Sequence, residues 1–432
     1  MMIDLKARPF YLDEEGINWV QTTLDNMTLE EKVGQVFCPV GVTAEEDILN
    51  HQILDIGIGG IMYRPGAKEE IYEVHKKIQD MAKIPLLLAA NTESGGDGLM
   101  YEGTSFGKPM AVAATGNVEN AYRMGYVACT EGAAVGLNWS FAPIVDIDME
   151  FHSPITNVRT FGSDIGQIIE CASNYMRGAD KAGVAVAIKH FPGDGTDERD
   201  QHILTSINKL SCEEWNATYG KIYQTLINEG AKTIMVGHIA MPAYVSAFNP
   251  EATAKDKLMP ATLSKEILTD LLRNKLEFNG LISTDSSSMI GFMAAMPREQ
   301  TVPMTLAAGA DVILFNKNLD EDVSFLIKGL KENLVSEKRL DEAVTRILAT
   351  KSALNLHKKK KTHTLVPDKA QMKIIGNEQF KEWAKEVADK SVTLIKDTQH
   401  LLPISNLKYK RIYMNLISRE TDPNQKNIQI GR

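Results

Sequence analysis

The sequence predicts an α/β protein built on a (β/α)8 TIM-type barrel, and three observations support this prediction. Short apolar runs alternate with longer amphipathic segments from about residue 16 to residue 355. Each run can be paired with a helix, and polar side chains able to do chemistry follow most of the runs. The eight predicted strands lie at residues 34–40, 57–63, 85–91, 137–143, 184–190, 233–238, 280–284 and 311–315.

Helix starts in this region carry capping boxes, in which a Ser or Thr is followed three residues later by Glu. The pairs are Thr28 with Glu31, Thr43 with Glu46, and Ser211 with Glu214. A seven-stranded or open variant of the barrel is compatible with the same pattern.

The chain is expected to contain a barrel at residues 1–356, closed by a helix at 340–356. A basic run at 357–366 is interpreted as a solvated linker. Residues 367–432 then read as the start of a second, apparently truncated α/β domain. That segment has a predicted helix at 377–390 and predicted strands at 391–396 and 409–417.

Composition excludes several classes of function. The chain has 432 residues, and its formal net charge of −9 disfavours a nucleic-acid partner. Neither a signal-peptide core nor an apolar run near the ~20 residues of a membrane span occurs, so a cytoplasmic protein without a membrane partner is expected. Widely spaced cysteines predict reduced, mostly buried thiols, and no metal or cofactor is expected. They are Cys38, Cys129, Cys171 and Cys212.

Polar residues gather at the carboxyl ends of the predicted strands. In a barrel these ends converge on one rim, so the side chains are expected to share a site. The residues are Asn91, Glu93, Asp146, Lys189, His190, His238, Asp285 and Asn316.

The segment 184–202 concentrates the most chemistry. An apolar run ends on Lys189 and His190, a Pro-Gly-Asp-Gly turn follows, and the loop closes on Asp200 and His202. An imidazole titrates near neutral pH, and a neighbouring carboxylate would fix its tautomer. The loop's acidic residues also allow a calcium site, although their spacing matches no known calcium loop.

Six motifs occur in the order typical of one enzyme family, and with them the sequence resembles the β-N-acetylglucosaminidase branch of glycoside hydrolase family 3. The resemblance runs from about residue 27 to residue 355 and continues into the following segment. The motifs lie at residues 27–35, 138–146, 159–164, 189–193, 200–202 and 284–285.

The resemblance implies roles for individual residues. Asp285 matches the family's catalytic nucleophile, and His202, oriented by Asp200, matches the general acid/base carried on a mobile loop in this branch. A second group of residues is implied to hold the sugar hydroxyls, although Glu93 could instead brace Lys189 or Arg159. This group comprises Asn91, Glu93, Arg159, Lys189, His190 and His238.

Three positions depart from the family pattern. Asn91 stands where the family usually has Asp, and the Arg common after the segment 91–96 is absent. Asp194 replaces a His that is frequent in bacterial cell-wall-recycling members. These differences leave the Asp and His machinery in place but leave the identity of the sugar open.

The expected function is a retaining exo-β-N-acetylglucosaminidase that removes terminal GlcNAc from small or muropeptide-type glycosides through a covalent glycosyl-Asp intermediate. A β-N-acetylglucosaminide phosphorylase and a β-glucosidase-type enzyme remain alternatives, as does a non-catalytic sugar-binding protein. Lys189 could also form a Schiff base, as in class I aldolases. The expected partner is a small carbohydrate, with homo-oligomerisation possible.

Overall fold

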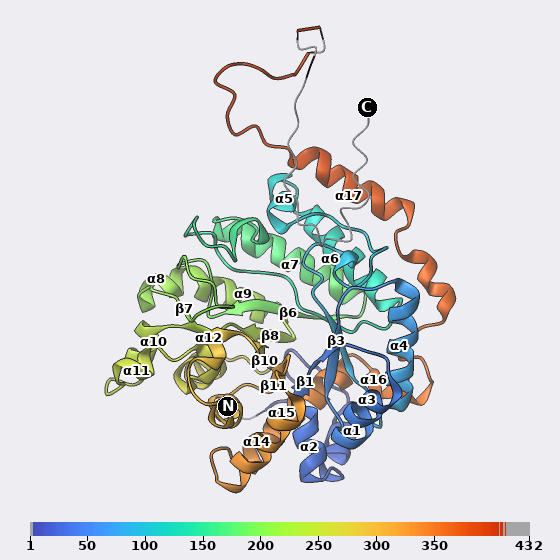
Figure 1. Cartoon of the computed structure of the whole chain (residues 1–432), viewed down its shortest axis with the longest axis vertical. Helices are drawn as coiled ribbons and strands as arrows, with labels where there is room; N and C mark the ends of the chain where they lie inside the picture. The colour runs from blue at the N-terminus through green and yellow to red at the C-terminus, as the bar shows by residue number, and fades with distance from the viewer. Residues whose placement is uncertain (1–2, 406, 409–410, 412–432) are drawn as a thin grey trace. The chain divides into compact units, whose positions relative to one another are not determined.

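Parallel strands form a nearly closed barrel in the computed structural model, which describes residues 3–405, 407–408 and 411, and helices lie outside the strands (Figure 1). The strand order is β1-β11-β10-β8-β6-β5-β4-β3-β2, with every neighbouring pair parallel. The predicted TIM-type α/β barrel is therefore confirmed. Its strands are β1 (Phe37–Cys38), β2 (Val40–Gly41), β3 (Gly60–Tyr63), β4 (Leu87–Ala90), β5 (Trp139–Ser140), β6 (Ala185–Phe191), β8 (Thr233–Val236), β10 (Leu281–Ser286) and β11 (Val312–Leu314).

The first predicted strand is split into β1 and β2 on either side of Pro39. Proline has no N–H to donate to a strand ladder, so an interruption at this position is expected. β1 pairs with β11 and β2 pairs with β3, so the broken strand connects the two ends of the strand order. All eight predicted strand positions are therefore occupied. A small parallel pair, β7 (Ser206–Ile207) and β9 (Ile239–Ala240), was not predicted.

The helices are numbered separately from the short 3-10 and π turns. The α-helices are α1 (Glu14–Asp25), α2 (Leu29–Gln35), α3 (Glu46–Asn50), α4 (Lys68–Met81), α5 (Pro109–Ala114), α6 (Glu119–Ala133), α7 (Ile165–Lys181), α8 (Cys212–Trp215), α9 (Lys221–Asn228), α10 (Pro242–Phe248), α11 (Ala254–Lys257), α12 (Ile290–Met293), α13 (Arg298–Ala308), α14 (Leu319–Lys331), α15 (Glu337–Ala353), α16 (Leu356–Lys361) and α17 (Glu378–Ser391). The remaining turns are η1 (His51–Ile56), η2 (Gly96–Gly98), η3 (Asn157–Arg159), η4 (Asn216–Gly220), η5 (Ala261–Leu263), η6 (Glu266–Lys275) and η7 (Lys369–Ile374).

Two of the three predicted capping boxes form, those that begin α2 and α8. The third prediction is wrong. Helix α3 begins at Glu46 after Glu45, and the Thr43 hydroxyl accepts a hydrogen bond from the Glu45 N–H instead.

Side chains alternate between the inside and the outside of the barrel, and this alternation determines which groups reach the rim. On β6, Ala185 and Ala187 belong to the interior cluster, whereas Val186 and Ile188 pack in the outer cluster against helices. Because successive strand residues point to opposite faces, Lys189 continues the interior row. Small alanines leave space that Trp139 fills, with its indole N–H donating to the Thr233 hydroxyl at 2.8 Å.

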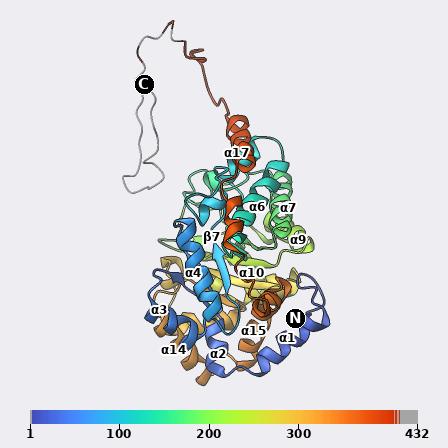
Figure 2. The same ribbon diagram turned by 90° about the vertical axis from the view of Figure 1, so that its right-hand side faces the viewer.

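The basic run forms a helix rather than an extended segment. It makes up most of α16, and the Lys360 ammonium donates to the Gln79 carbonyl at the end of α4. α17 then packs on α5 and α6 (Figure 2), and the compact unit that contains the barrel ends at Ser391. The predicted division of the chain into domains remains a prediction.

The helix predicted at 377–390 is confirmed as α17, but the strand predicted at 391–396 is wrong. Residues 392–397 have no regular structure, since no neighbouring strand among the described residues pairs with them. The Asp397 carboxylate instead accepts hydrogen bonds from the N–H groups of Leu401 and Leu402. The strand predicted at 409–417 falls almost entirely outside the described residues.

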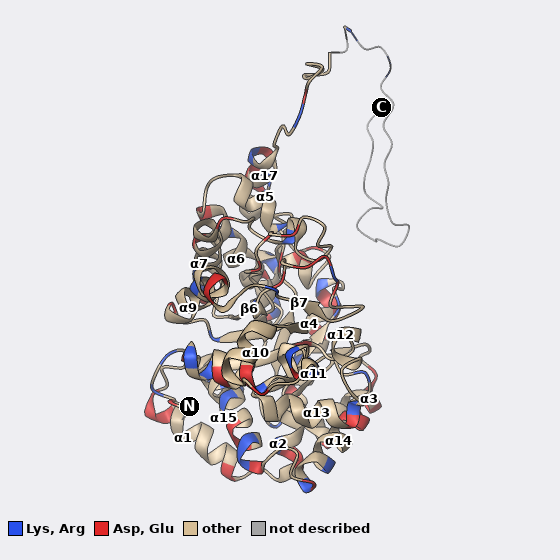
Figure 3. Cartoon of the chain, turned by 90° about the vertical axis from the view of Figure 1, so that its left-hand side faces the viewer, with Lys and Arg blue, Asp and Glu red and all other residues tan. Residues whose placement is uncertain are grey.

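Charged residues of both signs are scattered over the ribbon, with Lys and Arg interspersed among Asp and Glu (Figure 3). All four cysteines are free, three of them buried, so the prediction of thiols is confirmed. No helix among the described residues is long and apolar enough to cross a membrane.

Candidate active site

A cavity of about 350 Å3 opens at the carboxyl ends of the barrel strands. Most of the residues predicted at the rim line it, so the structure brings together groups that are far apart in the chain. The lining residues are Arg64, Asn91, Glu93, Ile155, Arg159, Lys189, His190, Gln201, His202, Met235, Asp285, Ser286, Ser288, Met289 and Phe315.

Glu93 holds two cations on one side of the cavity. Its Oε1 lies 2.7 Å from Lys189 Nζ and 2.8 Å from Arg159 Nη2, and its Oε2 accepts from Arg159 Nε at 3.1 Å. Burial opposes ionisation of this carboxyl, but the charges of Lys189 and Arg159 outweigh it and hold the Glu93 pKa well below its usual range. Glu93 therefore braces both cations, one of the two roles considered for it.

Asn91 accepts a hydrogen bond from Lys189 Nζ at 3.2 Å through its Oδ1. An aspartate here would add a second carboxylate beside Lys189. With asparagine the charged lining residues are three cations, Arg64, Arg159 and Lys189, against the two carboxylates of Glu93 and Asp285. The Lys189 ammonium is thus engaged in polar contacts on two sides, an arrangement suited to binding hydroxyls rather than to Schiff-base attack.

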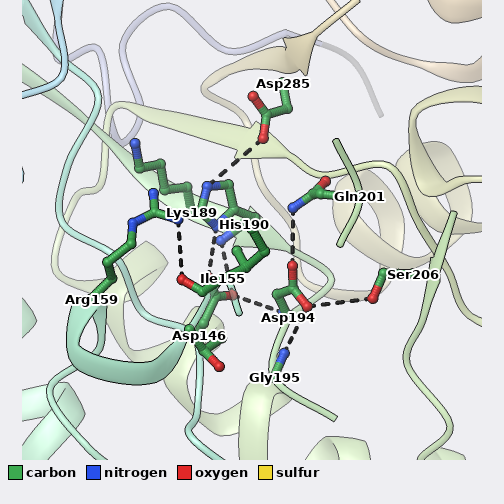
Figure 4. A network of polar contacts seen from close by, with 12 residues as sticks. Asp146, Ile155, Arg159, Lys189, His190, Asp194, Gly195, Gln201, Ser206 and Asp285 are labelled. Atoms are coloured by element: carbon green, nitrogen blue, oxygen red, sulfur yellow. Dashed lines mark hydrogen bonds and ion pairs between the residues drawn. The ribbon is translucent and has the colours of Figure 1, made fainter. Parts of the chain in front are cut away.

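Asp285 lies near the end of β10 with a side chain that is 15% exposed, and it faces a histidine–carboxylate pair (Figure 4). His190 Nε2 is 3.8 Å from Asp285 Oδ2, and His190 Nδ1 is 2.6 Å from the buried Asp146 Oδ2. Burial would raise the Asp285 pKa, but His190, His238, the Ser286 N–H and Lys189 together lower it below its ordinary value. The carboxylate form is therefore favoured at neutral pH.

Asp200 and His202 form a second carboxylate–imidazole pair, whose histidine lines the cavity. His202 Nδ1 lies 2.6 Å from Asp200 Oδ1, and the same oxygen accepts from the His202 backbone N–H at 2.8 Å. The imidazole is 54% exposed, in contrast to the buried His190. With Nδ1 bound to the carboxylate, Nε2 is the nitrogen left for proton exchange with a ligand.

His238 is placed differently from the other predicted sugar-binding residues. Its Nδ1 is 3.0 Å from the Thr262 hydroxyl and its Nε2 is 2.9 Å from the Ser286 carbonyl. The ring is fully buried, does not line the cavity, and burial lowers its pKa. The geometry gives His238 a supporting position beneath the segment that follows Asp285.

No individual role was assigned from the sequence to four polar residues that lie in or beside the cavity. Asp146 was predicted only to share the rim with the other strand-end residues, and Asp194 was noted only as an acidic loop residue and a departure from the family pattern. Arg64 belongs to no motif, and Gln201 lies inside the motif at residues 200–202 but is a neutral side chain that indicates no chemistry of its own. Across the described residues, no group of three or more His, Cys, Asp and Glu side chains is arranged to hold a metal ion.

Comparison with known proteins identifies the family. The description "Glycosyl hydrolase family 3 N terminal domain" matches residues 28–350. The chain belongs to glycoside hydrolase family 3. It is 42% identical over 411 residues to a β-N-acetylglucosaminidase/β-glucosidase of Cellulomonas fimi, covering 95% of this chain and 72% of that one.

Two solved structures show the same similarity in three dimensions. A β-glucoside phosphorylase, BglX, superposes with a TM-score of 0.90 at 43% identity, over 94% of this chain and 72% of that one. A family 3 β-N-acetylglucosaminidase from Paenibacillus superposes with a TM-score of 0.75 at 25% identity, over 87% of this chain and 71% of that one. This protein is thus a family 3 glycoside hydrolase with a barrel of the family's type.

The Glu93 ion pairs generate a prediction for stability. We expect Glu93→Gln to lower the free energy of unfolding at pH 7 by about 2 kcal/mol or more, because Lys189 keeps its buried charge without its partner. The folded-state pKa of Glu93 is depressed, so its contribution is present above the unfolded carboxyl pKa of about 4.3 and is lost as pH falls towards the folded value.

Denaturant unfolding between pH 7 and pH 3.5 measures this difference, with the exposed Glu70→Gln on α4 as the control. The gap between wild type and Glu93→Gln should shrink as the pH falls. A gap that stays constant or widens in acid contradicts the assignment.

Proposed function

We propose that this protein is a retaining, exo-acting β-N-acetylglucosaminidase in which Asp285 is the nucleophile and His202 the general acid/base. One observation carries the proposal: a mostly buried carboxylate and a half-exposed imidazole, the latter paired with its own aspartate, line one cavity at the barrel rim. Retaining hydrolysis requires one group to attack the sugar and a second to exchange a proton with the leaving oxygen.

In the first step Asp285 attacks the anomeric carbon, the bond to the leaving oxygen breaks, and His202 Nε2 gives that oxygen its proton. The lowered pKa of Asp285 keeps the nucleophile ionised. The Ser286 N–H, 2.7 Å from Asp285 Oδ1, fixes the orientation of the carboxylate. The product is a covalent glycosyl-Asp and a free alcohol.

In the second step His202, now neutral, takes a proton from water as the water oxygen attacks the anomeric carbon and the bond to Asp285 breaks. Asp200 holds the imidazole through Nδ1 in both steps and so keeps Nε2 directed at the reacting oxygen. The exposed position of His202 suits a group that must meet an outgoing alcohol and an incoming water.

The sugar itself would be held by the cationic side of the cavity. Lys189 and Arg159, braced by Glu93, present charged donors to hydroxyl groups, and Asn91 presents an amide. The preference for an N-acetylglucosaminide is supported by the Cellulomonas fimi relative, whose description also includes β-glucosidase activity. A β-glucoside is therefore the second sugar to test.

A leaving-group series tests the role of His202. We expect His202→Ala to lower kcat/KM, which reports the first step, about a hundredfold or more on glycosides with poor, alkyl leaving groups, because these need protonation. On dinitrophenyl glycosides, which leave without a proton, the loss in the first step should be far smaller. The control is His152→Ala, an exposed histidine hydrogen-bonded to Glu150. Equal losses for both classes of substrate would mean that His202 is not the acid.

Phosphorolysis is a second candidate, and the charge of the cavity favours it. The lining carries three cations and two carboxylates, so its net charge is positive and would attract a phosphate. An aspartate in place of Asn91 would cancel this positive charge. A neutral imidazole at His202 does not repel an incoming phosphate as a carboxylate would. The similarity to a β-glucoside phosphorylase supports the same interpretation.

Product analysis separates the two acceptors. With an N-acetylglucosaminide or a glucoside as donor, turnover in saturating phosphate should yield sugar 1-phosphate if phosphate replaces water in the second step. Free sugar alone, at an unchanged rate with and without phosphate, would leave hydrolysis as the reaction.

A further inference from the structure

Beneath the loop that carries Asp200 and His202 lies a buried hydrogen-bonded pair, Asp194 and Gln201 (Figure 4). Both residues are only 1% exposed, although the residues on either side of Gln201 face the cavity or solvent. Gln201 Nε2 donates to Asp194 Oδ2 at 3.0 Å. The side chain of Gln201 is therefore buried, although Gln201 lies in the chain between Asp200 and His202.

Asp194 connects this pair to the histidine beside Asp285. Its backbone N–H donates to Asp146 Oδ1 at 2.8 Å, and Asp146 Oδ2 contacts His190 Nδ1. Its other carboxylate oxygen accepts from the Gly195 N–H at 2.8 Å and from the Ser206 hydroxyl at 3.4 Å. Asp194 is thus held by hydrogen bonds at both its backbone and its side chain, in addition to the bond from Gln201.

Gln201 is fixed equally firmly at its far end. The backbone N–H of His238, just after β8, donates to Gln201 Oε1 at 2.7 Å. The glycines at 237 and 291 leave room here, since an added Cβ would lie 3.0 Å from Gln201 Oε1 and 2.6 Å from the Gln201 carbonyl respectively. Because an N–H can only donate, the amide oxygen must face His238 and the amide nitrogen must face Asp194.

We propose that Asp194 and Gln201 are positioning residues that set the height and orientation of His202 over the cavity. This inference rests on the proposed role of His202 as the general acid/base. Both ends of the Gln201 side-chain amide are hydrogen-bonded, so the backbone at position 201 has little freedom to move. The neighbouring Asp200 and His202 are therefore held in one position relative to the cavity. A displacement of about 1 Å in an acid/base can cost on the order of a hundredfold in rate.

In the hydrogen bond of this pair Gln201 is the donor and Asp194 the acceptor, so the bond depends on the protonation state of Asp194. Burial raises the Asp194 pKa to about 6, with the charge of Asp146 adding to the increase and His190, the Gly195 N–H and Gln201 opposing it. Two buried tyrosines also interact with the Asp194 charge: Tyr219, whose hydroxyl donates to the Asp194 carbonyl, and Tyr223. A proton on Asp194 Oδ2 would place a donor against the Gln201 amide and weaken this hydrogen bond, so the loop should be held less firmly in acid.

A donor–acceptor exchange tests the pair. Asp194→Asn places an amide donor against the Gln201 amide donor, and Gln201→Glu places two carboxylates face to face. The double variant Asp194→Asn/Gln201→Glu restores a single hydrogen bond with its direction reversed, while the new carboxylate at position 201 still accepts from the His238 N–H. Asp197→Asn is the matched control, since Asp197 lies on the same loop but accepts from the Ile207 N–H.

We expect each single variant to lower kcat/KM, which reports the first step, by about tenfold to a hundredfold on alkyl glycosides and by less than about threefold on dinitrophenyl glycosides, with the double variant recovering most of the loss. Equal losses of rate on both classes of glycoside would overturn the inference. So would a double variant whose rate is no higher than that of either single variant.

Amide hydrogen exchange of residues 193–206 in the full chain separates this inference from the proposed function. Exchange should quicken in each single variant and return towards wild type in the double variant, whether or not any glycoside is turned over. Unchanged exchange in the single variants would overturn the inference even if wild type is active.

Discussion

One buried carboxylate, Asp146, joins the parts of the site. Its Oδ1 accepts from the backbone N–H groups of His190 and Asp194, and its Oδ2 contacts His190 Nδ1. The end of β6 and the start of the following loop are thus tied to the segment after β5. A buried carboxylate is unfavourable unless it is fully hydrogen-bonded, and three donors meet this requirement. Asp146 thus fixes both the ring of His190 beside Asp285 and the backbone at the base of the His202 loop.

The site divides into a rigid part and an exposed part. Asp285 and Lys189 lie near the ends of β10 and β6, and Glu93 follows β4. All three are mostly buried and held by ion pairs, which suits the sugar-facing roles proposed for them. His202 lies on a loop and is half-exposed, which suits the proposed role of an acid/base that meets both the leaving alcohol and the incoming acceptor. The buried Asp194–Gln201 pair links the two parts, so the loop is supported by the same carboxylate, Asp146, that orients His190.

Local sequence pattern was sufficient for the barrel and for most of the rim. Each of the eight apolar runs contains a mostly buried part of the barrel sheet, and the polar residues that follow the runs converge because parallel strands end on one face. The strand at 391–396 was wrongly predicted because an apolar run alone does not supply the neighbour that a strand needs. Asp146 and Gln201 were missed because their roles depend on partners such as His190 and His238, 44 and 37 positions away, which no local spacing reveals.

The central claim is that Asp285 forms the covalent bond to the sugar. Incubating the protein with a 2-deoxy-2-fluoro glycoside that has a good leaving group should slow breakdown of the glycosyl-enzyme enough for peptide mass mapping. The account predicts a single added fluorosugar on the peptide that contains Asp285, absent in Asp285→Asn, with the circular dichroism of that variant unchanged. A label on any other carboxylate, or undiminished labelling of Asp285→Asn, would contradict it.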